Sequence, residues 1–123
     1  MPKRVLIVDD AIFMRNMIKD IFAGSAFEVV GEAANGLEAV EKHKALKPDL
    51  TTMDIVMPFK NGIEATREIL REDSEAVIII CSALGQESLV TEAIEAGATD
   101  FIVKPFKTEN VIQVAKKALA ARH

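Results

Sequence analysis

The sequence predicts an α/β fold in three layers, in which five helices flank a five-stranded parallel sheet. Three observations lead to this prediction. Short apolar runs recur at a steady interval, the segments between them have the spacing of amphipathic helices, and the middle runs are apolar almost throughout. Five repeats of strand and helix are typical of a parallel sheet that helices cover on both faces.

The first half of the chain supplies two strands and two helices. Strands are expected at residues 5–8 ("VLIV") and 27–30 ("FEVV"). Between them, residues 11–23 form a helix whose apolar stripe, at spacings of three and four, contains Met14, Met17, Ile18, Ile21 and Phe22. Residues 35–47 predict a second helix, whose apolar positions among the charges are Leu37, Val40 and Leu46.

The third and fourth strands flank a short helix. The run at residues 50–53 ("LTTM") is the least apolar of the five, because two threonines interrupt it. The helix at residues 62–70 carries on one face Ile63, Ile69 and Leu70. The strand at residues 77–81 ("VIIIC") contains the single cysteine, Cys81, which we expect to be a buried and unreactive thiol.

The last part of the chain predicts helix, strand and helix. Residues 86–97 form a helix that stops at Gly97 and has as its apolar positions Leu89, Val90, Ala93 and Ile94. A strand follows at residues 101–103 ("FIV"). The final helix, residues 108–121, is expected to bury Val111, Ile112, Ala115, Ala118 and Leu119.

Composition favours one soluble domain over residues 1–123. The formal net charge is −4 and basic residues are scattered, which disfavours direct binding to nucleic acid. The longest apolar stretch, residues 76–84, is too short to cross a bilayer, and "MPKR" at the start has no signal-peptide pattern. We therefore expect a cytoplasmic, monomeric protein without a further domain, whose partners are other proteins.

Polar residues follow each predicted strand, and all of them fall at one edge of the sheet. In chain order they are Asp9 and Asp10, Glu32, Asp54, Ser82 and Lys104. In the strand order 2-1-3-4-5, the first and third strands are neighbours, and ligands bind at this edge. Asp54 is therefore expected beside Asp9 and Asp10.

Three neighbouring carboxylates need a cation. At roughly 5 Å and an effective dielectric constant near 20, each pair repels by about 3 kcal/mol. Oxygen ligands suit hard cations such as Mg²⁺. With a lysine and a serine hydroxyl nearby, the cluster predicts a carboxylate that accepts a phosphoryl group.

Each of these residues also has a purely structural interpretation. Asp10 could cap a helix, Asp54 could begin a turn, Ser82 could cap the next helix and Lys104 could be a solvated strand end. Glu32 is expected on the surface. Packing roles are expected for Met14, Met57 and Phe106. The gathering of the polar groups at one edge favours the functional interpretation.

Several motifs resemble the receiver domains of two-component response regulators. They are "VLIVDD", "MDIVMP", "NGIEA", "CSA" and "DFIVKPF", and "DDAIFMR" is similar to the stand-alone chemotaxis regulators. The resemblance spans nearly the whole chain and implies a flavodoxin-like fold. It implies a signalling protein rather than a metabolic enzyme, in which Asp54 accepts a phosphoryl group from the phosphohistidine of a histidine kinase.

The resemblance also implies roles around the phosphoacceptor. Asp10, Asp54 and the backbone carbonyl of Val56 would bind Mg²⁺, and Asp9 would do so directly or through water. Ser82 and Lys104 would contact the phosphoryl oxygens. Phe101 would be the switch aromatic that moves together with Ser82, and the peptide bond between Lys104 and Pro105 would be cis.

The output surface would comprise residues 86–97, 101–103 and 108–121, and would bind a flagellar switch component or another output protein. A phosphorelay or type IV pilus control are alternative settings. Two positions depart from the usual pattern. Val56 stands where many chemotaxis regulators have asparagine, and Phe101 stands where tyrosine is commoner.

Two other functional classes use similar folds. Phosphatases of the haloacid dehalogenase type also have an aspartate nucleophile and magnesium, but their DxD motif is absent, since Ala11 and Ile12 follow the aspartate pair. A flavin- or nucleotide-binding module is disfavoured because the sequence has neither G-x-G-x-x-G nor a P-loop pattern.

Overall fold

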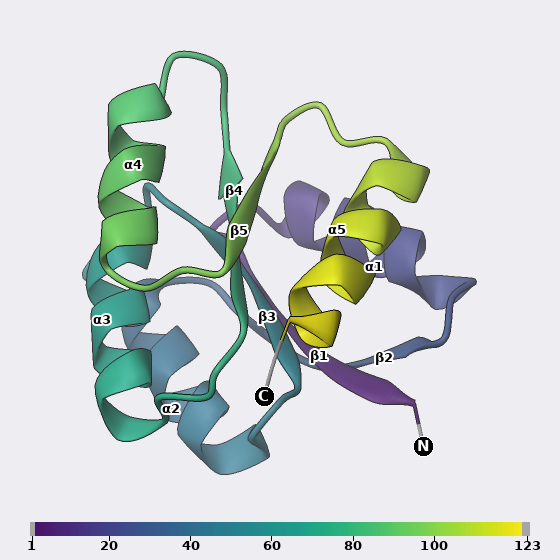
Figure 1. Ribbon diagram of the computed structural model, residues 1–123, viewed down its shortest axis with the longest axis horizontal. Helices are drawn as coiled ribbons and strands as arrows, with labels where there is room; N and C mark the ends of the chain where they lie inside the picture. The colour runs from purple at the N-terminus through teal and green to yellow at the C-terminus, as the bar shows by residue number, and fades with distance from the viewer. Residues whose placement is uncertain (1, 122–123) are drawn as a thin grey trace.

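The computed structural model describes residues 2–121, so Met1 of the leading "MPKR" and the last two residues lie outside the described part. Strands and helices alternate along the chain (Figure 1). The strands are β1 (Lys3–Val8), β2 (Phe27–Ala33), β3 (Leu50–Asp54), β4 (Ile78–Ser82) and β5 (Asp100–Val103). The helices are α1 (Ile12–Ala23), α2 (Gly36–Leu46), α3 (Gly62–Glu72), α4 (Glu87–Glu95) and α5 (Thr108–Ala120).

The five strands form one parallel sheet in the order β2-β1-β3-β4-β5, which confirms the predicted topology. Helices α1 and α5 cover one face, and α2, α3 and α4 cover the other (Figure 1). Val8 of β1 pairs with Met53 of β3, and Asp54 pairs with Cys81 of β4. The carboxyl ends of the central strands therefore lie at the same level.

Each central strand is buried on both faces, as parallel strands between two helical layers must be. Leu6 and Val8 belong to the hydrophobic cluster under α2–α4, whereas Val5 and Ile7 belong to the cluster under α1 and α5. The threonines of β3 are completely buried as well, which shows that the least apolar run is still a central strand.

Asparagine side chains begin two of the helices. Asn35 accepts a hydrogen bond from the backbone N–H of Glu38 at the start of α2. Asn61 and Glu64 form a reciprocal capping box at the start of α3. Helix α4 ends just before Gly97, whose φ of +114° suits glycine, so the predicted stop at this residue is confirmed.

The predicted apolar helix faces were too wide at two positions, since Leu37 is 48 % exposed and Ile94 is 40 % exposed. Ile112 and Leu119 are half-buried and pack against the core. In α2 the small residues Gly36 and Ala39 face the protein interior instead. The N–H of Gly36 donates to the carbonyl of Lys60, and this close approach turns Leu37 toward solvent.

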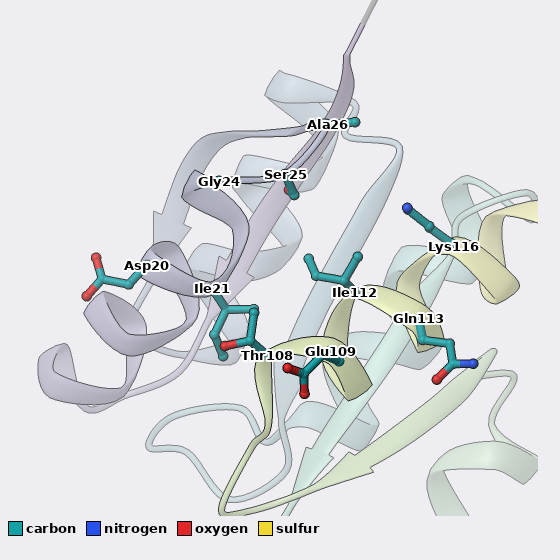
Figure 2. Close-up of a pocket in the computed structure, with 10 residues that line it drawn as sticks. All are labelled: Asp20, Ile21, Gly24, Ser25, Ala26, Thr108, Glu109, Ile112, Gln113 and Lys116. Carbon is teal, nitrogen blue, oxygen red and sulfur yellow. The ribbon is translucent and has the colours of Figure 1, made fainter.

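A hollow of about 830 Å³ explains the partial exposure of Ile112. The hollow lies between α1 and α5, with Ile21 and Ile112 at its centre and Asp20, Glu109 and Lys116 around it (Figure 2). None of the polar residues predicted at the sheet edge lines it.

No helix within residues 2–121 combines the length and the apolar character that crossing a membrane requires.

Candidate functional site

Three carboxylates meet at the carboxyl ends of β1 and β3. Asp9 and Asp10 follow β1, and Asp54 is the last residue of β3. One carboxylate oxygen from each residue lies within 4.8 Å of the other two; Asp9 and Asp54 are buried, and Asp10 is exposed. The structure thus brings Asp54 beside the aspartate pair, as the strand order predicts.

Lys104 reaches this cluster from the end of β5. Its Nζ lies 3.3 Å from Oδ1 of Asp54 and 3.5 Å from Oδ2 of Asp9. The peptide bond between Lys104 and Pro105 is cis. Since β4 lies between β3 and β5, only a long side chain could bring a positive charge from β5 to Asp54.

The charges in the site shift the pKa values of Asp54 and Lys104. Burial, and then the negative charge of Asp9, raise the pKa of Asp54 from 3.8 to about 6, although Lys104 opposes the shift. Burial alone would lower the pKa of Lys104, but the charges of Asp54 and Asp9 outweigh it and raise that pKa. At neutral pH the carboxylate of Asp54 is therefore mostly ionised, and Lys104 is an ammonium group.

Two structural alternatives for the site residues are wrong. Helix α1 has Ala11 at its N-cap position and no side-chain cap, so Asp10 does not cap it. Instead, Oδ1 of Asp9 accepts a hydrogen bond from the N–H of Ala11 at 2.9 Å. Helix α4 begins at Glu87 after Gln86, so Ser82 does not cap that helix either.

Ser82 ends β4 as a buried residue. Among residues 2–121, its Oγ makes only a long contact, 3.5 Å, with the carbonyl oxygen of Ile102. Its neighbour Cys81 is buried beside Asp54, and burial raises the pKa of the Cys81 thiol, so the thiol stays protonated. The predicted unreactive cysteine agrees with this environment.

Val56 and Phe101 are both exposed. Val56 lies two residues beyond Asp54, in the loop before α3. Phe101 points outward from β5 and lines a hollow of about 380 Å³ together with Val90 and Ile94 of α4. Met57 is buried, and Met14 and Phe106 pack against the core, as predicted.

Gly62 supports the site, although sequence reasoning assigned it no role. Its N–H donates to the carbonyl of Ile55 at 2.7 Å, and a Cβ there would lie 2.0 Å from the carbonyl oxygen of Asp54. No larger residue fits without moving β3. The sequence signal was the Asn61–Gly62 pair, which begins α3.

Glu32 was predicted to follow β2 on the surface, but it lies inside β2 and is half-buried. Lys19 contacts its carboxylate at 2.8 Å and Arg15 at 3.0 Å. The hydrogen bond from Lys19 and that from Arg15 lower the pKa of Glu32, although burial opposes them. The strand continues through Glu32 because β1 pairs with it as far as Ala33.

Comparison with known proteins identifies the family of this chain. The response regulator receiver domain family matches residues 5–116. The chemotaxis protein CheY of Thermotoga maritima is 61 % identical over 117 residues, which cover 95 % of this chain and 98 % of that protein.

Two solved structures have the same fold. The response regulator domain of Thermotoga maritima CheB superposes with a TM-score of 0.92 at 39 % identity, over 100 % of both chains. A chain of the CheX–CheY–BeF3–Mg²⁺ complex from Borrelia burgdorferi superposes with a TM-score of 0.90 at 39 % identity, over 95 % of this chain and 89 % of that one. These matches favour the receiver prediction over a phosphatase or a nucleotide-binding module. The chain belongs to the response regulator receiver domain family.

Proposed function

We propose that this chain, as one receiver domain over residues 1–123, is a two-component response regulator that is switched by phosphorylation of Asp54. The proposal rests on the cluster of Asp9, Asp10 and Asp54. Three carboxylates lie within 4.8 Å of one another and Lys104 is their one ammonium partner among residues 2–121. The phosphodonor would be the phosphohistidine of a histidine kinase.

The donor set fits a magnesium ion. Carboxylates of Asp9, Asp10 and Asp54 are hard oxygen ligands, and three carboxylates with one ammonium leave two negative charges, which one divalent cation balances. The backbone carbonyl of Val56 would complete the protein's ligands. Bound Mg²⁺ would supply charge neutralisation for the phosphoryl oxygens during transfer.

The transfer forms one bond and breaks one. A carboxylate oxygen of Asp54 attacks the phosphorus atom, and the bond between phosphorus and the histidine nitrogen breaks, with its electron pair staying on that nitrogen. Because the pKa of Asp54 is about 6, the carboxylate is ionised at neutral pH and can act as nucleophile. Lys104 would bind a phosphoryl oxygen and stabilise the charge that it carries.

The switch would follow from the new charge. The phosphoryl group carries about −1.5 to −2 charge and three acceptor oxygens, and it replaces the single negative charge of the Asp54 carboxylate. The Oγ of Ser82 has only a long contact in this structure, so it is available to donate to such an oxygen. Movement of Ser82 would change the packing around Phe101, the switch aromatic, which is exposed here.

The output surface would be formed by α4, β5 and α5. Phe101 and Ile94 are exposed apolar side chains on it, and a protein partner could cover them. The relatives named chemotaxis protein CheY support a role in chemotaxis. We propose in addition that the protein acts in flagellar motor control, as a monomer in the cytoplasm. The protein would transmit a signal rather than turn over a metabolite.

Intact mass after incubation with acetyl phosphate tests the proposal. We expect one phosphoryl adduct on the wild type in the presence of Mg²⁺, none after EDTA, and none on Asp54→Asn. Asp20→Asn, which changes an exposed carboxylate outside the cluster, is the matched control and should be phosphorylated like the wild type. A folded wild type that gains no adduct with Mg²⁺, or an adduct that survives Asp54→Asn, would refute the assignment.

A further inference from the structure

Arg15 connects helix α1 to the turn that carries the carboxylate cluster. Its Nη1 donates to the carbonyl oxygen of Asp9 at 2.7 Å, and its Nε donates to Oε1 of Glu32 at 3.0 Å. The side chain of Arg15 is only 14 % exposed. A single guanidinium therefore joins α1, the turn after β1, and β2.

The backbone of Asp9 is held on both sides. Its N–H donates to the carbonyl of Ala33 at 3.0 Å, and its carbonyl accepts from Arg15. The next residue, Asp10, is exposed and its carboxylate has no ion-pair partner within residues 2–121. The direction in which Asp10 points thus depends on the backbone of the turn, and Arg15 fixes the carbonyl at its centre.

We propose that Arg15 is a positioning residue, which orients the turn of Asp9 and Asp10 for a divalent cation. The inference rests on the proposed Mg²⁺ site. A guanidinium suits this role because its planar fork can donate in two directions at once, which an ammonium does less well. Glu32 balances the positive charge of Arg15, so that the guanidinium can lie close to the proposed Mg²⁺ site.

Positioning and electrostatics predict opposite effects of removing Arg15. Loss of a positive charge near the cluster would by itself strengthen Mg²⁺ binding. Loss of the hydrogen bond to the Asp9 carbonyl would let the turn move and would weaken Mg²⁺ binding. Lys19 separates the two effects, because it contacts the same Glu32 carboxylate at 2.8 Å and makes no hydrogen bond to Asp9.

The test measures Mg²⁺ affinity of the full chain by isothermal titration calorimetry, since the chain has no tryptophan or tyrosine to report binding by fluorescence. We expect Arg15→Gln to bind Mg²⁺ about 10-fold more weakly than the wild type, the size typical of lost outer contacts to metal ligands. Lys19→Gln should bind Mg²⁺ as tightly as the wild type or slightly more tightly. Amide hydrogen exchange of residues 9–11 should be faster in Arg15→Gln and unchanged in Lys19→Gln.

Circular dichroism checks that each variant is folded. If Arg15→Gln does not fold, Arg15→Lys replaces it, and we expect this variant to bind Mg²⁺ several-fold more weakly than the wild type because its ammonium cannot span both acceptors. A folded Arg15 variant with wild-type or tighter affinity would overturn the inference and leave the proposed function intact. A wild type without Mg²⁺ affinity would overturn both.

Discussion

Replacing Asp54 with asparagine should make the metal-free protein more stable at neutral pH. Asp54 is 8 % exposed and faces Asp9, and burial together with the charge of Asp9 raises its pKa from 3.8 to about 6 despite the opposing charge of Lys104. Asparagine keeps the size of the side chain and removes the charge. The variant therefore relieves a repulsion that the fold otherwise contains.

The sign and size of the effect follow from this pKa. Because the folded protein binds the Asp54 proton more tightly than the unfolded chain does, the contribution of Asp54 to wild-type stability decreases as the pH rises from 3.8 through 6 and is constant above. The difference between the two values corresponds to about 3 kcal/mol. Water at the exposed Asp10 side of the cluster screens part of this electrostatic energy. We therefore expect Asp54→Asn to be about 1–2 kcal/mol more stable than the wild type.

Urea unfolding followed by far-UV circular dichroism, in EDTA, measures this gain. The midpoint for Asp54→Asn should rise by roughly 0.5–1 M urea at about pH 7.5, and the gain should disappear near about pH 4. Asp20→Asn should unfold like the wild type at both values. If Asp54→Asn is less stable than the wild type at about pH 7.5, or keeps its full gain at about pH 4, the reasoning is wrong.

Three further changes test the fold around the site. Thr52→Val should raise the melting temperature by roughly 3–5 °C, about 1 kcal/mol, because the Thr52 hydroxyl is buried and has no hydrogen-bond partner among the described residues; an unchanged or lower value would contradict this. Gly62→Ala should cost about 3 kcal/mol in urea unfolding, since its Cβ would lie 2.0 Å from the Asp54 carbonyl oxygen, whereas Gly24→Ala, with nothing within 4 Å, should cost little; equal effects would refute the packing argument. Burial lowers the pKa of His43, with Asp73 and Glu72 opposing, so His43 contributes stability above about pH 6.5 that is lost as the pH falls. His43→Gln should therefore lose less stability than the wild type between about pH 7.5 and pH 5.5, and an equal loss would exclude His43 as the cause.

The sequence predicted the central strands β1 and β4 well because burial on both faces leaves a continuous apolar run, whereas two threonines interrupt the run of β3. The edge strand β2 was predicted to end at Val30, but it continues to Ala33. Gly31 and Glu32 look like the beginning of a turn, yet an edge strand pairs on one side only and tolerates such residues. Local composition cannot reveal how far the neighbouring strand continues to pair.

The site was predictable as far as strand order determines it. Parallel topology alone places Asp54 beside Asp9 and Asp10, and it places Lys104 at the same edge. Contacts to backbone atoms were not predictable. Arg15 binds a carbonyl oxygen and Gly62 lies against another, and backbone atoms leave no pattern in the sequence from which their partners could be inferred.

The destabilisation of the fold by the carboxylate cluster and the proposed chemistry of the cluster have the same electrostatic origin. Asp54 is destabilising because it is buried next to Asp9, and the same place brings it within 3.3 Å of Lys104. Phosphorylation would add about one further negative charge to a cluster in which three carboxylates already exceed the one ammonium by two charges. A single ammonium cannot balance that addition, so the need for a divalent cation increases after transfer. The cluster would therefore hold a phosphoryl group stably only while the divalent cation is bound, so removal of the cation would destabilise the phosphorylated state.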